Sequence, residues 1–160
     1  DSWKAFIELQ KRGLCRSIGV SNFTIENLKE LEEKYDVLPA INQVEFHPYH
    51  YQKELLEYCN SKNIIIEAYS PLVHAKRMDE PRLMAISDEL GKTPAQVLIR
   101  WAIQRGMVVL PKSVNQDRIV ENFAVFDFDI SNSLMKRLDD LDERYVTCWD
   151  PHNPPPYAPV

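Results

Sequence analysis

Four short apolar segments alternate with amphipathic segments along this chain, and this order limits the possible folds more than any other feature. The segments expected to form strands cover residues 15–20, 40–46, 64–69 and 107–110. The segments between them carry apolar residues at helical spacing. Strands that alternate with helices through short connections pair in parallel, with right-handed crossovers. The pattern therefore predicts an α/β protein built on one parallel sheet, and no linker or sequence repeat divides it.

Capping residues mark where the helices should begin. Thr24, Asn115 and Ser131 each precede an amphipathic segment and can accept a hydrogen bond from its first turn. Residues 93–96 (Thr-Pro-Ala-Gln) form a capping box with proline at the first helical position. Gly13 is a suitable end for the first helix. The predicted helices begin near residues 2, 24, 52, 81, 94, 115 and 131.

Every predicted strand ends in polar side chains. These clusters are Ser21-Asn22, Asn42-Gln43 with Glu45, Tyr69-Ser70, and Lys112-Ser113. A (β/α) barrel builds its site in this way, from the carboxyl ends of several strands. A doubly wound sheet usually carries a glycine-rich first turn instead. The chain has four glycines and no G-x-G-x-x-G motif, so the pattern favours the barrel.

A basic, donor-rich segment follows the last predicted strand. Lys112 and Ser113 come directly after Leu110-Pro111, and Arg118 lies in the first turn of the helix that Asn115 caps. Two cations beside a helix N-terminus suit a phosphate group, and favour a phosphomonoester over a carboxylate. On this segment alone, a solvated turn with basic side chains explains the residues equally well.

Charge and cysteine content exclude several classes of protein. The net charge is −5 and no run of Lys or Arg is present, which argues against nucleic-acid binding. The apolar runs are too short to span a bilayer. Residues 1–4 lead directly into an amphipathic helix, so no signal peptide is expected. Cys15, Cys59 and Cys148 are widely spaced, and we expect reduced thiols in a cytoplasmic protein.

A metal site is not expected. His47 and His50 form an H-x-x-H pair, but Pro48 between them prevents their presentation on a helix. No third ligand lies nearby in the sequence. Glu45 and Glu67 are expected to be interior or supporting groups, without an assigned chemical role.

In the residues around the strand ends, the sequence resembles the aldo-keto reductase family. The matching segments are residues 19–23 (Gly-Val-Ser-Asn-Phe), 41–45 (Ile-Asn-Gln-Val-Glu) with His47-Pro48, 68–72 (Ala-Tyr-Ser-Pro-Leu), 110–113 (Leu-Pro-Lys-Ser) and 118–122 (Arg-Ile-Val-Glu-Asn). They occur in the family's order and at about its spacing, from the first helix to Asp150. The resemblance implies a (β/α)8 TIM barrel that binds NADP(H) and reduces aldehydes and ketones to alcohols by direct hydride transfer.

The resemblance also implies roles for residues at the nicotinamide end of the cofactor. Ser21, Asn22 and Gln43 match positions that hydrogen-bond the carboxamide, whose acceptor and donors complement hydroxyl and amide groups. Tyr69 matches the aromatic residue that stacks on the nicotinamide ring. Ordinary roles remain open for all of them: Gln43 as a polar group of the barrel rim, Tyr69 as a core aromatic, and Ser21-Asn22 as a turn.

Seven further residues match positions along the diphosphate and the adenosine. They are Ser70 and Leu72 near the pyrophosphate, Lys112, Ser113 and Arg118 at the 2′-phosphate, and Glu121 and Asn122 at the adenine.

The chain also departs from the family. A complete reductase of this type is about twice as long, and its catalytic tyrosine, lysine, aspartate and histidine lie on earlier strands. Nothing here matches those four. We therefore expect residues 1–150 to be a C-terminal half-barrel that carries the cofactor side, followed by a proline-rich tail over 151–160. Trp149, with Tyr157, is either a wall of the substrate pocket or an anchor for the tail.

Several consequences are expected from a half-barrel. The chain alone should be inactive, and its partners should be a small carbonyl substrate and an N-terminal half-barrel from the same or another chain. The strand residues expected to face the barrel interior, and to lack packing partners, are Ile18, Val20, Val44, Ile66 and Val109. The alternative is a non-catalytic nucleotide-binding or structural subunit derived from this family.

Overall fold

The computed structural model describes residues 2–148 and contains one sheet of four parallel strands. The strands lie in sequence order and are β1 (Gly19–Ser21), β2 (Ile41–Glu45), β3 (Ile65–Tyr69) and β4 (Val108–Val109). The predicted parallel α/β fold is confirmed. Trp149, Tyr157 and the tail over 151–160 lie outside the described residues.

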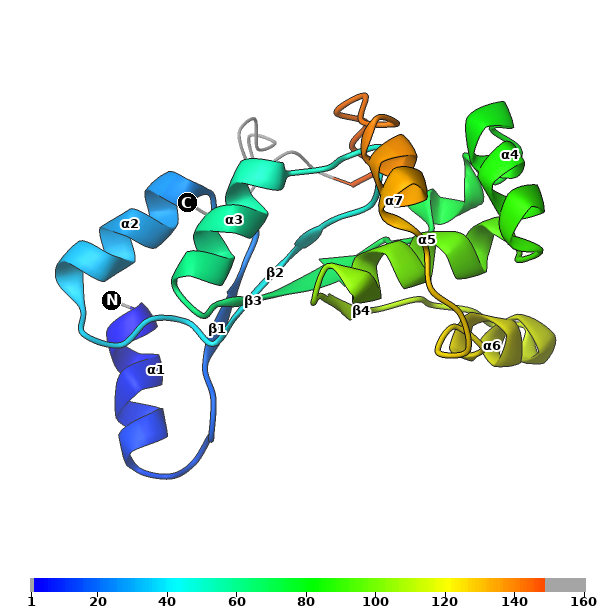
Figure 1. The fold of residues 1–160 in the computed structure, drawn as a ribbon. Coiled ribbons are helices and arrows are strands. Elements are labelled where there is room, and N and C mark those ends of the chain that lie inside the picture. The colour runs from blue at the N-terminus through cyan, green and yellow to red at the C-terminus, as the bar shows by residue number, and fades with distance from the viewer. Residues whose placement is uncertain (1, 149–160) are drawn as a thin grey trace.

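Helices cover one side of the sheet and both of its ends. They are α1 (Ser2–Lys11), α2 (Ile25–Lys34), α3 (Lys53–Ser61), the short 3-10 helix η1 (Val73–Ala75), α4 (Pro81–Leu90), α5 (Pro94–Gln104), α6 (Gln116–Phe123) and α7 (Asn132–Asp139). Figure 1 shows α2, α3 and α5 along one side of the strands, with α1 and α6 at opposite ends of the sheet. None of these helices is both long and apolar enough to cross a bilayer.

The predicted helix starts depend on the capping contacts that the sequence indicated. Thr24 accepts a hydrogen bond from the backbone N–H of Asn27, and Thr93 and Gln96 form the reciprocal capping box. The Asn115 side chain accepts from the N–H of Arg118 at 3.1 Å, which fixes the start of α6. Ser131 caps α7 in the same way. These contacts orient the helices that follow the polar strand ends.

The first strand is shorter than predicted, because only Gly19–Ser21 pairs rather than residues 15–20. Gly19 lies opposite Ile41, where β2 begins. Earlier residues would need partners before Ile41, in the turn that contains Pro39, and proline has no N–H to donate. Ile18 instead packs with Trp3, Ile7 and Leu31 in a small cluster under α1 and α2.

The residues predicted to face the barrel interior are on the opposite face of the sheet. The register pairs Val20 with Asn42 and Ile66, and Val44 with Ala68 and Val109, so these side chains share the face that the helices cover. That prediction was wrong. Side chains along a strand alternate between the two faces of the sheet, so a wrong choice of face for one residue places the whole strand the wrong way round. Val44, Ile66 and Ala68 are fully packed rather than without partners.

The uncovered face of the sheet is termed here the inner face. Its residues, read from the register, are Gly19, Ser21, Ile41, Gln43, Glu45, Ile65, Glu67, Tyr69 and Val108. Ile65 and Val108 remain 46% and 41% exposed. A face that carries exposed apolar side chains and has no covering layer is what half of a barrel should present.

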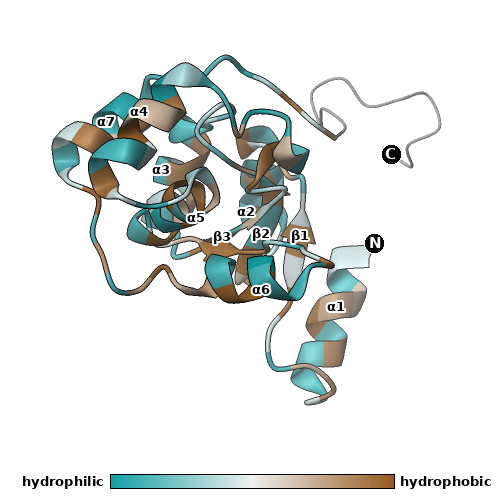
Figure 2. Cartoon of the chain, turned by 90° about the vertical axis from the view of Figure 1, so that its right-hand side faces the viewer, coloured by the Kyte–Doolittle hydropathy of each residue, from teal (hydrophilic) through white to brown (hydrophobic). Residues whose placement is uncertain are grey.

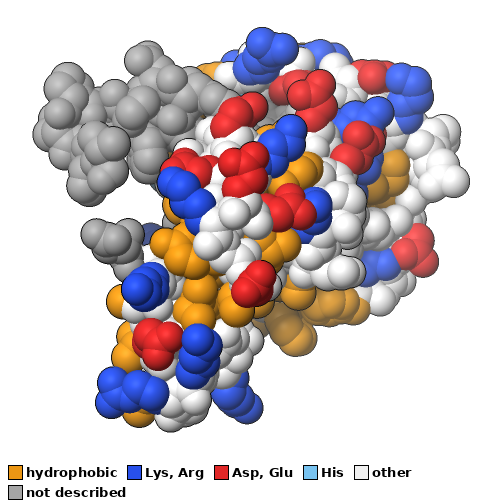
Figure 3. Space-filling view, turned by 90° about the vertical axis from the view of Figure 1, so that its left-hand side faces the viewer, with side chains coloured by type: hydrophobic (Ala, Val, Ile, Leu, Met, Phe, Trp, Pro, Cys, Tyr) orange, Lys and Arg blue, Asp and Glu red, His pale blue; other side chains and the backbone are white. Residues whose placement is uncertain are grey.

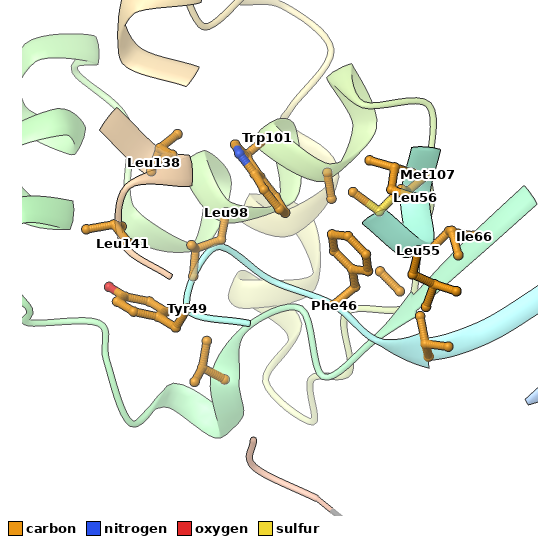
Figure 4. Close-up of a cluster of buried hydrophobic side chains, with 14 of the residues drawn as sticks. Phe46, Tyr49, Leu55, Leu56, Ile66, Leu98, Trp101, Met107, Leu138 and Leu141 are labelled. Carbon is orange, nitrogen blue, oxygen red and sulfur yellow. The ribbon is translucent and has the colours of Figure 1, made fainter. Parts of the chain in front are cut away.

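The main core lies between the outer face of the sheet and the helices. Phe46, Trp101 and Tyr51 form tilted and edge-to-face contacts at its centre, and Figure 4 shows Trp101 and Phe46 among the surrounding leucines. Asp139 accepts hydrogen bonds from Trp101 and from Arg105, which joins α7 to α5. The sheet is therefore held firmly from one side only.

Exposed apolar side chains mark both ends of the sheet. Phe123 and Phe126 are 76% and 64% exposed and form an edge-to-face pair at α6, and Figure 2 shows apolar residues on this helix. At the other end, Trp3, Phe6 and Ile18 line a cavity beside β1. Figure 3 shows apolar side chains gathered on that side of the molecule. Together with the inner face, these ends are surfaces that a closed barrel would cover.

Two adjacent isoleucines provide a test of the face assignment. Ile66→Ala removes a fully buried side chain, and we expect it to lower the free energy of unfolding by about 2–4 kcal/mol. Ile65→Ala removes a side chain of the inner face, and its cost should stay below about 1 kcal/mol. Urea unfolding of both variants measures the difference, and a larger cost for Ile65→Ala would show that the faces are inverted.

Candidate functional site

Seven of the predicted site residues line one cavity of about 760 Å³ at the carboxyl ends of β3 and β4. They are Ser70, Leu72, Lys112, Ser113, Arg118, Glu121 and Asn122. Ser70 and Leu72 follow β3, Lys112 and Ser113 follow β4, and the other three come from α6. Residues from three parts of the sequence are thus brought together, as the polar strand ends predicted.

The two basic side chains of the cavity, Lys112 and Arg118, make no ion pair with another group in residues 2–148. The backbone of Arg118 is held by the cap from Asn115, whose own N–H donates to Ser113 Oγ at 3.1 Å. Two unpaired cations beside a helix N-terminus form a donor set for a phosphate group.

Glu121 and Asn122 are held at the α5 side of the cavity. Thr93 Oγ donates to the Glu121 carboxylate, and the Gln96 side chain donates to the backbone carbonyls of Glu121 and Ala124 at 3.3 and 3.0 Å. Asn122 is 8% exposed and lines the cavity. The Glu121 carboxylate therefore already has a hydrogen-bond donor, and its other oxygen is the group available to a ligand.

The remaining four predicted residues form a second group, joined by hydrogen bonds at the ends of β1, β2 and β3. Ser21 Oγ and the Asn22 N–H both donate to the Gln43 carbonyl, at 3.0 and 2.8 Å. Tyr69 donates its hydroxyl proton to Asn22 Oδ1 at 3.0 Å. Tyr69 is followed directly by Ser70 of the cavity, so the two groups are continuous through β3. The eleven residues thus lie in one row along the strand ends, seven in the cavity and four beside it.

Asn42, by contrast, is a structural residue. It is fully buried on the helix-covered face, where its side chain exchanges hydrogen bonds with the backbone N–H and carbonyl of Phe23 at 3.3 and 2.9 Å. This contact fixes the turn that presents Ser21 and Asn22.

Backbone strain gathers at the same strand ends. Asn22 and Ser70 have φ values of 58° and 50°, and Val73, His74 and Ala75 are also in the left-handed region. Such conformations cost about 1–3 kcal/mol each for residues other than glycine. Strain of this kind persists where the surrounding structure imposes it, and here it coincides with the predicted site residues Asn22 and Ser70.

Glu67 contacts the predicted site directly. Its carboxylate accepts a hydrogen bond from Gln43 Nε2, its register partner on the inner face. The side-chain amide oxygen of Gln43 is thereby turned away from Glu67 and toward other donors. The sequence analysis expected Glu67 to be an interior or supporting group, and this hydrogen bond to Gln43 is a supporting contact of that kind.

Glu45 contacts the far end of the described chain. Its carboxylate accepts hydrogen bonds from the backbone N–H groups of Thr147 and Cys148 at 2.7 and 3.0 Å, from the Thr147 hydroxyl, and from His47 Nε2 at 3.1 Å. Burial alone would raise the pKa of the Glu45 carboxyl, but these hydrogen bonds lower it to about 2. The carboxylate is therefore ionised under ordinary conditions.

A thiol lies beside the start of the cavity. Cys148 Sγ is 3.4 Å from Ser70 Oγ and 3.5 Å from His74 Nε2, and the last two atoms are 3.1 Å apart. No local signal in the sequence could reveal this group, because Cys148 meets residues more than seventy positions earlier. Cys59, in contrast, is buried, and burial raises the pKa of its thiol to about 11.

The tyrosines of this region are poor acids. Burial, with the nearby Cys148 and Glu45, raises the pKa of Tyr69 to about 12, despite the hydrogen bond to Asn22. Burial raises the pKa of Tyr49 even further. Neither hydroxyl is tuned to give up a proton near neutral pH.

Metal ligation finds no support in the described residues. His47 is buried with its Nε2 on Glu45, and His50 lies across an isolated bridge from it. No three His, Cys, Asp or Glu side chains gather between residues 2 and 148 in a way that could hold a metal ion.

Comparison with known proteins gives one consistent result. A model described as the Aldo/keto reductase family matches residues 1–143. A glyoxal reductase of Bacillus subtilis is 44% identical over 146 residues, which cover 90% of this chain and 53% of that protein. A methylglyoxal reductase of Salmonella typhimurium is 43% identical over 145 residues, covering 89% and 53%.

A solved structure agrees with these relatives. The crystal structure of a Bombyx mori aldo-keto reductase in complex with NADP superposes with a TM-score of 0.85 and 32% identity, over 91% of this chain and 51% of that one. The chain thus spans about half the length of the proteins it matches.

The depressed pKa of Glu45 predicts how stability depends on pH. A carboxyl whose pKa falls from 4.5 to about 2 on folding stabilises the native state fully above pH 4.5, by about 3 kcal/mol, and this is lost as pH falls toward 2. Glu45→Gln should remove this part of the pH dependence. Urea unfolding from pH 7 to pH 2.5 measures the free energy of unfolding of the wild type and of Glu45→Gln. The difference between the two free energies should narrow as pH falls.

The exposed Glu57, which pairs with Lys53 on α3, supplies the matched control. Glu57→Gln should leave the profile close to that of the wild type. A constant gap between wild type and Glu45→Gln across the whole range would contradict the role assigned to Glu45.

Proposed function

The chain belongs to the aldo/keto reductase family, and we propose that it forms the cofactor-binding, C-terminal half of an NADP(H)-dependent carbonyl reductase. The single observation that carries the proposal is the row of eleven residues along the strand ends, with hydrogen-bonding groups at one end and unpaired cations at the other. An extended dinucleotide has the same polarity: a neutral carboxamide at one end and a phosphate-bearing adenosine at the other.

The cationic end favours NADP(H) over NAD(H). Lys112, Ser113 and Arg118 would hold the adenosine 2′-phosphate, with the Arg118 guanidinium offering a pair of parallel donors. Ser70 and Leu72 would lie along the pyrophosphate, and Glu121 and Asn122 at the adenine.

The uncharged end would orient the nicotinamide. Ser21, Asn22 and Gln43 would bind the carboxamide, with Gln43 oriented by its contact with Glu67. The Tyr69 ring, held by its hydrogen bond to Asn22, would stack on the nicotinamide and fix which face of that ring presents the hydride. When bound, NADPH supplies the hydride that reduces the carbonyl carbon. The residues of this half bind and align the cofactor, and alignment of the reacting groups is itself a large part of the rate enhancement.

Protonation of the carbonyl oxygen requires a group from elsewhere. The pKa of Tyr69 is raised rather than lowered, and its hydroxyl is already engaged with Asn22. We therefore propose that an N-terminal half-barrel, in the same or another chain, supplies the catalytic tetrad and covers the inner face. If that N-terminal half is absent, the lack of a suitable proton donor at Tyr69 favours the alternative, a non-catalytic nucleotide-binding or structural subunit.

The substrate proposed is a small carbonyl compound. The relatives named as glyoxal and methylglyoxal reductases support this class. We assign the protein to the cytoplasm, because all three cysteines are free thiols.

A fusion protein provides the direct test. The chain is placed after the N-terminal half of the Bacillus subtilis glyoxal reductase, which is 44% identical to it over the shared part. We expect NADPH-dependent reduction of methylglyoxal by the fusion and only background oxidation of NADPH by either half alone. Turnover by this chain alone would show that its catalytic groups have been misplaced, and a folded but inactive fusion would favour the non-catalytic alternative.

Cofactor selectivity gives a further prediction. Arg118→Ala should weaken NADPH binding to the fusion by about tenfold and leave NADH binding nearly unchanged, because NADH lacks the 2′-phosphate. Arg118→Lys should recover only part of the loss. The measurement is quenching of tryptophan fluorescence at fixed ionic strength, because salt screens the contact.

Arg12, exposed after the end of α1, is the matched control, and Arg12→Ala should change neither affinity. Equal weakening of NADPH and NADH by Arg118→Ala would mean that Arg118 holds α6 in place and does not bind the phosphate.

A further inference from the structure

We propose that Glu45 is a positioning residue: it fixes residues 146–148 beside Tyr69, at the nicotinamide end of the row of strand-end residues, where this segment forms a wall for the carbonyl substrate. The proposal rests on the function proposed above. Glu45 belongs to the inner face of the sheet and is the register partner of Tyr69, but it does not line the cationic cavity, and within the described residues its carboxylate bonds only to Thr147, Cys148 and His47. Its effect on the reaction is therefore exerted through the segment that it holds.

The burial of Glu45 is unlike that of its neighbours. Among the nine inner-face residues, Glu45 alone is buried, with 3% of its surface exposed. Gln43, two residues earlier on the same strand and face, is only partly covered. The difference arises because residues 147 and 148 pass directly over the end of β2 and close off this position. The cover is local to the rim, which leaves the rest of the inner face open.

The bonding geometry requires a carboxylate. Four donors converge on the two oxygens: two backbone N–H groups, the Thr147 hydroxyl and His47 Nε2. An ionised carboxylate only accepts, and it has lone pairs for all four. A glutamine would turn an NH2 group toward at least one of these donors. Glu45 thus joins β2 to a segment more than one hundred residues away.

This contact determines what stands over the nicotinamide end. Glu45 is the register partner of Tyr69, the residue expected to stack on the nicotinamide ring, and Cys148 of the segment that it holds is among the groups that raise the pKa of the Tyr69 hydroxyl. Cys148 lies 3.4 Å from Ser70 Oγ and 3.5 Å from His74 Nε2, on the strained β3 rim. A carbonyl compound that approaches the ring from the rim would meet Thr147 and Cys148 first.

Limited proteolysis tests whether Glu45 holds the segment. Trypsin cleaves after the exposed Arg144, and cleavage requires the flanking residues to leave their native contacts. In the chain itself, Glu45→Gln should speed this cleavage about tenfold, with cleavage after Arg12 unchanged as an internal control. Thr147→Val, which removes only the hydroxyl bond, should have a smaller effect in the same direction. Equal cleavage rates after Arg144 in wild type and Glu45→Gln would overturn the proposal.

Steady-state kinetics of the fusion protein test the role in substrate binding. Glu45→Gln should raise the KM for methylglyoxal about tenfold and keep the NADPH dissociation constant within about twofold, and Glu45→Asp should recover part of the loss. Lower stability is expected in either case, but a merely structural role would weaken the binding of cofactor and substrate together. That outcome, or an unchanged KM, would overturn the substrate-wall role.

The two arms separate this inference from the function on which it rests. If the fusion with the wild-type chain is folded but inactive, the proposed reductase function fails and the substrate-wall role fails with it. The trypsin rates then still decide whether Glu45 holds residues 146–148, because they are measured on the chain alone.

Discussion

The parallel register between β2 and β3 is the constraint on which the rest of this structure depends. It sets Gln43 opposite Glu67 and Glu45 opposite Tyr69, and thereby assigns four polar groups to one face. The same register sends Val44, Ile66 and Ala68 to the other face, where α3 and α5 bury them. A shift of one residue would exchange the two sets, and would place carboxylates in the apolar core at a large desolvation cost. Site and core are therefore specified by the same pairing.

Much of the fold could be predicted from the sequence because its signals are local. Thr24, Thr93 and Asn115 cap helices where the sequence indicated, since each contact lies within four residues. The parallel sheet followed from the alternation of elements. The faces of the strands could not be chosen in the same way, because Ile65 and Ile66 look equivalent until the position of the helices is known.

The residues of the candidate site could likewise be predicted only where their partners are close in the sequence. Lys112, Ser113 and Arg118 are close in sequence, and they gather in the cavity as their spacing suggested. Tyr69 and Asn22 are forty-seven residues apart, and only the resemblance to a known family indicated that they belong together. The contact of Glu45 with Thr147 and Cys148 left no trace in either segment, since it depends on the path of the whole chain. Each residue was predictable to the extent that its partners were local.

The short outer strands also determine how this chain would associate with itself at high concentration. β1 has three residues and β4 has two, so little free backbone is offered for the addition of another strand. The exposed apolar area instead lies on the inner face and around Phe123 and Phe126, where attraction has no fixed direction. Ordered fibrils require long, free strand edges that can stack in register. Self-association of this chain should therefore yield amorphous precipitates, which a covering layer of apolar groups or a mild detergent would disperse.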